Sequence, residues 1–230
     1  MQTSDLALVR GLADTRATLA AWNERPGPII TRWVAGSLAV ALLLLASVWL
    51  VASLSEPDVS HAFYGGGQAE LGQVLHVVGR NSLVLALHGF ACLAGFIAGS
   101  SLPQEAERYH GAMRWVHDKA GPLATVFVVG AIGFSLITQA YVLGQGASSL
   151  AWQLDISPAL LLIGLLPHAL PELVALFLPL AAWMIASRRG DWHELLAATI
   201  VTVLLAFPVL LAAALVEVFV TPSLLRALAG

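Results

Sequence analysis

The sequence predicts an all-α integral membrane protein with about five transmembrane helices and short interfacial helices beside them. Charged residues make up only 11% of the chain and hydrophobic residues 58%, whereas soluble proteins contain about 25% charged residues. Several apolar stretches reach the roughly 20 residues that a helix needs to cross a bilayer. We therefore expect a cytoplasmic segment at the membrane surface over residues 1–28 and a single transmembrane domain over residues 29–230.

Five apolar stretches form the expected spans, and each is followed by glycine, proline or charged residues that favour the end of a helix. The third stretch is followed by the sequence GQGASS, which we interpret as a loop. The single cysteine, Cys92, lies in the second stretch, so the chain has no internal disulfide. The stretches are residues 29–54, 81–102, 121–143, 156–187 and 195–220.

The distribution of lysine and arginine predicts the orientation of the chain. With the N-terminus in the cytoplasm, every Lys and Arg except Arg80 and Arg226 lies on the cytoplasmic side. Such an asymmetry is what the positive-inside rule requires of a correct topology. We expect a multi-pass protein of the inner (cytoplasmic) membrane, with a cytoplasmic N-terminus and an extracytoplasmic C-terminus.

Two amphipathic segments are expected to lie on the membrane surface. Residues 6–22 combine spaced apolar side chains with charged ones between them, a pattern typical of an interfacial helix. Residues 68–78 follow a glycine-rich turn, and one helical face of this segment carries the apolar residues. We interpret the second segment as an ordered amphipathic loop, with substrate gating as an alternative. Its predicted apolar face consists of Leu71, Val74, Leu75 and Val78.

Small residues on the second span predict a helix-packing face. Ala91, Gly95 and Gly99 follow one another at intervals of four residues and therefore share one side of a helix. Rows of small residues allow helix backbones to approach closely in lipid. The sequence leaves open whether the contact is within one protomer or across a homodimer.

The fourth span is long and carries three prolines, at positions 167, 171 and 179. Thirty-two helical residues measure about 48 Å at 1.5 Å per residue, against a hydrocarbon core of about 30 Å. Each proline removes one backbone hydrogen bond from a helix. We therefore expect the span to be kinked or broken at Pro167 and Pro171, and leave open whether residues 156–172 cross the membrane or re-enter it.

His168 and Glu172 stand four residues apart within this span, close to its middle. We expect the two side chains to lie in the protein interior and to interact, because lipid exposure would leave a carboxyl group in hydrocarbon. They are interpreted as a structural pair, as part of a route for protons, ions or a polar headgroup, or as a metal or hydrolytic site. The last alternative would need further ligands, of which His88 in the second span is one.

Further polar residues lie toward the expected outer ends of other spans. Glu217 precedes the end of the fifth span, and Arg80 and Asn81 open the second. The topology places all three on the same side of the membrane, so an Arg80–Glu217 pair is plausible.

Three sequence segments together resemble the stage II sporulation protein M family of membrane proteins. They are RNSLVLALHGFACLAGFIAG, LLPHALPELVALFLPLAAW and VLLAAALVEVFVTP, and the similarity spans roughly residues 75–222. The most specific match is the motif Pro167-His168-x-x-x-Glu172. Ala169 departs from the glycine of the family motif, and Arg80-Asn81 replaces a pair of asparagines.

The resemblance implies a non-enzymatic membrane anchor or assembly partner in cell-envelope processes, since the sporulation member holds cell-wall hydrolases during engulfment. The alternative is a small transporter, channel or flippase-like protein that uses His168 and Glu172. No HExxH, GxSxG or CxxC motif occurs in the sequence, so we expect no catalytic residues, metal or cofactor. A net charge of −3 gives no indication of nucleic-acid binding. The expected partners are the lipid bilayer and either a second copy or an envelope protein.

Overall fold

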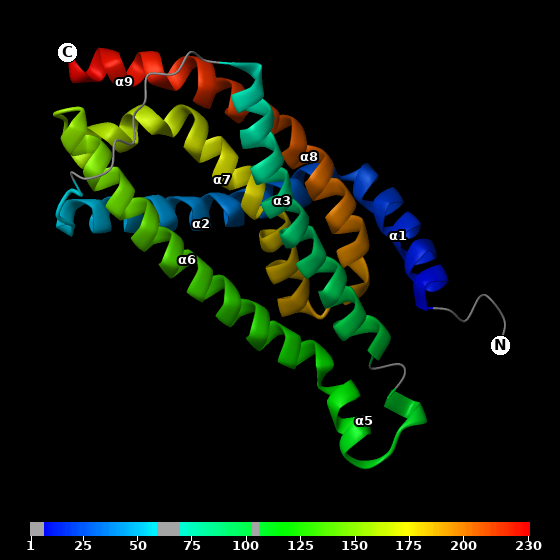
Figure 1. The fold of residues 1–230 in the computed structure, drawn as a ribbon. Helices are drawn as coiled ribbons and strands as arrows, with labels where there is room; N and C mark the ends of the chain where they lie inside the picture. Colours follow the sequence, from blue (N-terminus) through cyan, green and yellow to red (C-terminus); the bar gives the residue numbers. More distant parts are fainter. Residues whose placement is uncertain (1–6, 59–69, 103–105) are drawn as a thin grey trace. The chain divides into compact units, whose positions relative to one another are not determined.

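The computed structural model describes residues 7–58, 70–102 and 106–230, and within these ranges the chain is almost entirely helical, without strands. Five helical tracts in the described residues are long and apolar enough to cross a membrane (Figure 1). The predicted all-α membrane protein with five spans is confirmed. The tracts are α2 (Pro26–Leu54), α3 (Leu71–Phe96) with its π-helical extension η2 (Ile97–Ser101), α6 (Ala120–Gln153), α7 (Pro158–Arg189), and residues 192–229.

Shorter helices flank the five tracts. α1 (Ala7–Glu24) precedes α2, in agreement with the helix predicted over residues 6–22, although the side chains of residues 7–12 lie outside the described part. η3 (Ala106–Arg108) and α5 (Gly111–Asp118) connect the second tract to the third. The last tract consists of η4 (Trp192–Glu194), α8 (Leu195–Leu215), the π-helix η5 (Val216–Val220) and α9 (Thr221–Ala229).

The chain divides into two compact units, and each long helical tract contributes one part to each unit. Unit 1 contains Met1–Ser37, Val84–Ala131 and Phe177–Ala206, and unit 2 contains Leu38–Leu83, Ile132–Leu176 and Phe207–Gly230. Every Lys and Arg except Arg80 and Arg226 belongs to unit 1. The division of the helices therefore coincides with the division of positive charge from which the topology was predicted.

The amphipathic segment predicted over residues 68–78 is not a separate element. α3 begins at Leu71 and continues without interruption into the second span, while residues 68 and 69 lie outside the described residues. The predicted apolar face is correct in part: Val74 is buried and Val78 packs beside it, whereas Leu71 and Leu75 are more than 70% exposed. Val77, which the prediction omitted, is buried with Val74 against Ala214 and Val218.

The loop predicted after the third span is wrong, because α6 remains helical through residues 144–149. A Cβ atom placed on Gly144 would lie 2.5 Å from Cβ of Val51 and 3.1 Å from the Val48 carbonyl oxygen. Glycine at this position therefore lets α6 approach α2 within unit 2. Small residues that resemble a loop in the sequence here allow two helices to pack closely.

The two serines of the same segment bind the backbone just after α2. The Ser148 hydroxyl donates a hydrogen bond to the Ser55 carbonyl oxygen over 2.9 Å. The Ser149 hydroxyl accepts one from the Asp58 amide, also over 2.9 Å. Backbone polar groups at the end of a helix lack partners within the helix, and burying them unpaired is costly. These two hydrogen bonds therefore stabilise the chain just after α2.

α7 is one uninterrupted helix that contains all three prolines of the fourth span. The predicted break, with partial re-entry, is absent, and the yellow part of α7 is curved (Figure 1). Prolines that remove single helical hydrogen bonds account for such a bend. The helix ends at Gly190, whose φ is +76°. The amides of Gly190 and Asp191 bond back to the carbonyls of Ser187 and Ala186, which is a Schellman cap.

The predicted packing face of the second span contacts tryptophan side chains of unit 1. A Cβ on Gly95 would lie 2.5 Å from Nε1 of Trp183, and one on Gly99 would lie 2.0 Å from the Trp192 ring. Ala91 on the same face is half-buried. The row of small residues therefore makes room for two indole rings within one protomer.

The core of unit 1 is formed by apolar side chains of α3, α7 and α8. Trp183 and Cys92 are fully buried at its centre. The Cys92 thiol donates a hydrogen bond to the Pro179 carbonyl oxygen at 3.2 Å. A second cluster in the same unit joins α2 to α7 and α8 through Trp33, Leu178, Ala182 and Ala198.

Candidate polar site in the membrane

Unit 2 brings together polar side chains from three of the spanning tracts. They come from the first half of α3, the middle of α7 and the junction of η5 with α9. We refer to this group as the polar cluster; it consists of Arg80, Asn81, His168, Glu172, Glu217 and Thr221.

His168 is buried, with 8% of its surface exposed. Its Nδ1 atom lies 2.8 Å from the Thr221 hydroxyl oxygen. The same hydroxyl lies 3.2 Å from the Val216 carbonyl oxygen, to which its geometry also allows it to donate. The single hydroxyl proton goes either to that carbonyl or to Nδ1, according to the tautomer of the His168 ring.

The π-helical turn η5 determines where Glu217 and Thr221 lie. The Thr221 amide bonds to the carbonyl of Val216, five residues earlier, which is the hydrogen-bond pattern of a π-helix. Pro222 follows in the first turn of α9, where a missing N–H leaves no helical bond unmade. Such turns within α-helices are frequent at functional sites.

The Glu172 carboxyl group lies beside the Asn81 amide and within electrostatic range of Arg80 and Glu217. Asn81 is buried, and its Nδ2 atom makes no hydrogen bond of ordinary geometry. The Asn81 amide and the Glu172 carboxyl group are therefore neighbours, but Nδ2 is not oriented to donate a hydrogen bond. A buried amide nitrogen without a hydrogen-bond acceptor is unfavourable in a folded protein.

Arg80 acts on both carboxyl groups of the polar cluster. It lies within electrostatic range of Glu172 and of Glu217, and its own side chain is exposed. Oε2 of Glu217 is buried without a hydrogen bond. Arg80 therefore lies near Glu217, as the topology suggested, and Glu172 lies near both of them.

Among the described residues, the structure shows no direct interaction between His168 and Glu172, which the sequence had predicted. His168 Nδ1 binds Thr221 instead. Glu172 interacts with Asn81 and Arg80 of α3 and with Glu217 of η5. Four-residue spacing places two side chains on one helix face, but neighbouring helices decide which partners they meet. Thr221 was missed because only its position before a proline marked it in the sequence.

His88 belongs to unit 1, whereas the residues of the polar cluster belong to unit 2. Its ring centroid lies 6.0 Å from that of Phe177. Among the described residues, no group of three or more His, Cys, Asp or Glu side chains could hold a metal ion. Comparisons with known protein families, curated proteins and solved structures gave no match to this chain.

Proposed function

We propose that this multi-pass membrane protein moves protons or small monovalent cations across the membrane through the polar cluster. The observation that carries the proposal is that two carboxyl groups from different helices, Glu172 and Glu217, lie within electrostatic range of each other and of the Arg80 guanidinium group. Ionisable residues inside membrane spans commonly mark ion pathways and proton relays.

The balance of charge in the cluster favours a small cation as its ligand. Arg80 brings one positive charge within electrostatic range of two carboxyl groups, Glu172 and Glu217. The second carboxyl group must then carry a proton or hold a cation, because an uncompensated charge in the membrane interior is costly. Exchange of that proton or cation is the step that transport requires.

His168 is suited to accept a proton in the same process. Its Nδ1 shares a hydrogen bond with the Thr221 hydroxyl group, so proton exchange would take place at Nε2. The ring orientation is held by a hydrogen bond on the opposite nitrogen, as in other proton-relay histidines.

We also propose that the protein is not an enzyme. This proposal rests on the sequence, which contains no HExxH, GxSxG or CxxC motif.

Proton flux into proteoliposomes tests the transport proposal. The full-length chain is reconstituted in phosphatidylcholine vesicles that contain a pH-sensitive dye, and a valinomycin-clamped potassium gradient drives proton entry. We expect flux above that of empty vesicles for the native protein, and a return to the empty-vesicle level for Glu172→Gln. A parallel experiment with sodium and potassium indicators distinguishes cations from protons.

Glu56→Gln is the matched control, because Glu56 is an exposed carboxyl group just after α2 in the same unit. It should leave the flux unchanged. Native protein that transports neither protons nor cations, or a Glu172→Gln variant that transports normally, contradicts the proposal.

A second candidate function is the membrane anchor or assembly partner in cell-envelope processes that the family resemblance implies. It is favoured by α5, an amphipathic helix in the connection between two spans with Met113, Trp115 and Val116 exposed. Exposed apolar side chains of this kind suit a protein partner. Photo-crosslinking in cells from position 115, with position 114 on the polar side as control, should capture a discrete envelope protein or a second copy. Absence of any position-specific adduct would exclude this use of α5.

A further inference from the structure

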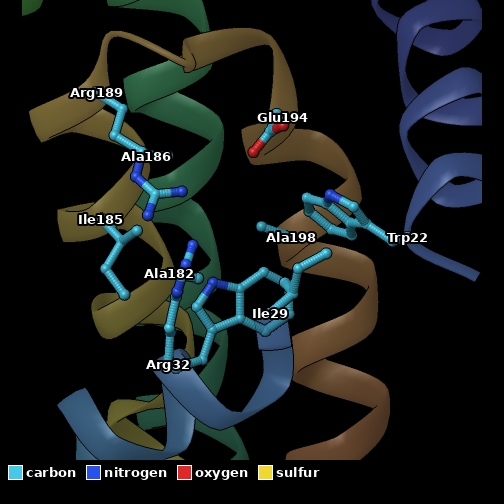
Figure 2. Close-up of a pocket in the computed structure, with 10 residues that line it drawn as sticks. Trp22, Ile29, Arg32, Ala182, Ile185, Ala186, Arg189, Glu194 and Ala198 are labelled. Atoms are coloured by element: carbon cyan, nitrogen blue, oxygen red, sulfur yellow. The ribbon is translucent and has the colours of Figure 1, made fainter. Parts of the chain in front are cut away.

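Unit 1 contains a cavity of about 210 Å³ between α1, α2, α7, η4 and α8. Its lining combines two guanidinium groups and one carboxyl group with apolar side chains. Arg32 of α2 and Arg189 of α7 extend their guanidinium groups toward the same space, and Glu194 of η4 lies across from them (Figure 2). Glu194 is also within electrostatic range of Arg189.

A second, larger hollow of about 440 Å³ lies next to this cavity and is lined almost entirely by apolar residues of α1, α2 and α8. The two hollows share Trp22, Ile29 and Trp33 in their walls. Trp22 and Trp33 hold α1 against α2 through an edge-to-face contact, with ring centroids 5.1 Å apart. A charged cavity therefore adjoins an apolar groove, with Trp22, Ile29 and Trp33 in the lining of both.

We infer that these two hollows form a binding site for one anionic phospholipid. The phosphodiester group lies between Arg32 and Arg189, and an acyl chain lies along the groove beside Trp22 and Trp33. Guanidinium groups bind phosphate oxygens through paired, charge-assisted hydrogen bonds. The inference concerns a site in unit 1 and does not depend on the transport proposed for unit 2.

Charge favours an anionic lipid over a zwitterionic one. Two guanidinium groups and one carboxylate give the cavity a net charge of about +1, which a single phosphodiester neutralises. Glu194 is then placed to accept hydrogen bonds from headgroup hydroxyls, as a glycerol headgroup provides. A phosphatidylcholine headgroup would bring a quaternary ammonium that donates no hydrogen bond and leaves the cavity positively charged.

The apolar groove favours a lipid over a free phosphate ion. A free anion would occupy the charged cavity and leave the hollow lined by Leu19, Ile30 and Val201 unfilled. An acyl chain fills this apolar hollow, which a free anion cannot do. The positive-inside rule predicts that the cavity lies in the cytoplasmic leaflet. Anionic lipids are enriched in that leaflet, and basic pockets between helices bind their headgroups.

Thermal unfolding of the full-length protein in a non-ionic detergent tests the site. The probes are dihexanoylphosphatidylglycerol, dihexanoylphosphatidylcholine, glycerol phosphate and inorganic phosphate. A ligand that binds only the folded state raises the midpoint in a saturable manner. We expect such a rise with the phosphatidylglycerol, and little or none with the other three at the same concentration.

Two sets of variants separate the headgroup cavity from the groove. The double substitution Arg32→Gln/Arg189→Gln should weaken phosphatidylglycerol binding by at least about tenfold, because it removes both charged donors. Arg188→Gln is its control, since Arg188 is exposed at the same end of α7 but does not line the cavity. Ala20→Trp places an indole in the groove, and Ala17→Trp places one elsewhere on the exposed surface of α1.

The outcomes decide between the possible ligands. Equal stabilisation by inorganic phosphate would show a free-anion site and overturn the lipid assignment. Equal stabilisation by phosphatidylcholine would overturn the role of charge. A phosphatidylglycerol effect that survives the double arginine substitution, or that is lost equally in Ala20→Trp and Ala17→Trp, would place the lipid elsewhere. Size-exclusion profiles of each variant establish that it is folded.

Discussion

The Nδ1 atom of His168 lies 2.8 Å from the hydroxyl oxygen of Thr221, across 53 residues of sequence. The bond joins the middle of α7 to the first residue of α9 in unit 2. Thr221 in turn bonds through both its amide and its hydroxyl to the Val216 carbonyl oxygen. The π-helical turn, the orientation of the histidine ring and the packing of two helices are therefore linked at one side chain.

Thr221→Val is expected to destabilise the protein by about 1–3 kcal/mol, because it leaves a buried imidazole nitrogen without its hydrogen-bond partner. Thr221→Ser retains the hydroxyl group and should be close to native. The measurement is the free energy of unfolding in mixed micelles. If the two variants are equally stable, the His168–Thr221 hydrogen bond contributes nothing to the fold.

Glu172→Leu is expected to lower stability, whereas Glu172→Gln should have a small effect. Leucine removes the polar neighbour of Asn81 and the charge that faces Arg80, while glutamine can still hydrogen-bond an amide. The expected difference between the two variants is about 1–3 kcal/mol, measured by thermal or denaturant unfolding in detergent. Equal stabilities would mean that Asn81 and Arg80 do not rely on Glu172 in the folded state.

Gly95→Leu should disrupt the core of unit 1, because even a Cβ atom at this position would lie 2.5 Å from the Trp183 ring nitrogen. Trp183 is fully buried and packed against Cys92, Phe96 and Leu195, so a cost of about 1–3 kcal/mol or more is expected. Gly130→Leu is the control, since no atom lies within 4 Å of a Cβ placed there. A lower thermal midpoint for Gly95→Leu alone would support the packing, and equal midpoints would refute it.

The topology makes a separate prediction that does not depend on stability. A reporter fused after Gly230 should indicate an extracytoplasmic C-terminus, and one inserted near Arg114 should indicate the cytoplasm, because nearly all positive charge lies in unit 1. Alkaline phosphatase and green fluorescent protein fusions measure the two sides independently. Two cytoplasmic reporters would show that the number of membrane crossings between these positions is even.

The spans could be predicted because the length and apolarity of a membrane helix are local properties of the sequence. Their ends were predicted less well where distant contacts determine them. The GQGASS segment has the composition of a loop, yet Gly144 and Ser148 fit it as a helix against α2. The buried face of residues 71–78 was predicted only in part, because Ala214 and Val218, far along the chain, cover Val74 and Val77 and leave Leu71 and Leu75 exposed.

The candidate site was predicted in part for the same reason. Hydrophobic surroundings marked His168, Glu172 and Glu217 as unusual, and topology placed Arg80 on the same side as Glu217. The partner of His168 could not be predicted, because it depends on a π-helical turn that shifts Thr221 along its helix. Helical spacing favoured Glu172 as that partner, and tertiary packing selected another.

Cys92 has a practical consequence for labelling experiments. The only thiol of the chain is fully buried and donates a hydrogen bond to the Pro179 carbonyl oxygen. Maleimide reagents need a thiolate that they can reach, so the folded native protein should resist modification. A cysteine introduced at position 114 or 230 can then be modified selectively from either side of the membrane without first replacing Cys92. Any maleimide uptake by the unmutated chain would report the opening of unit 1.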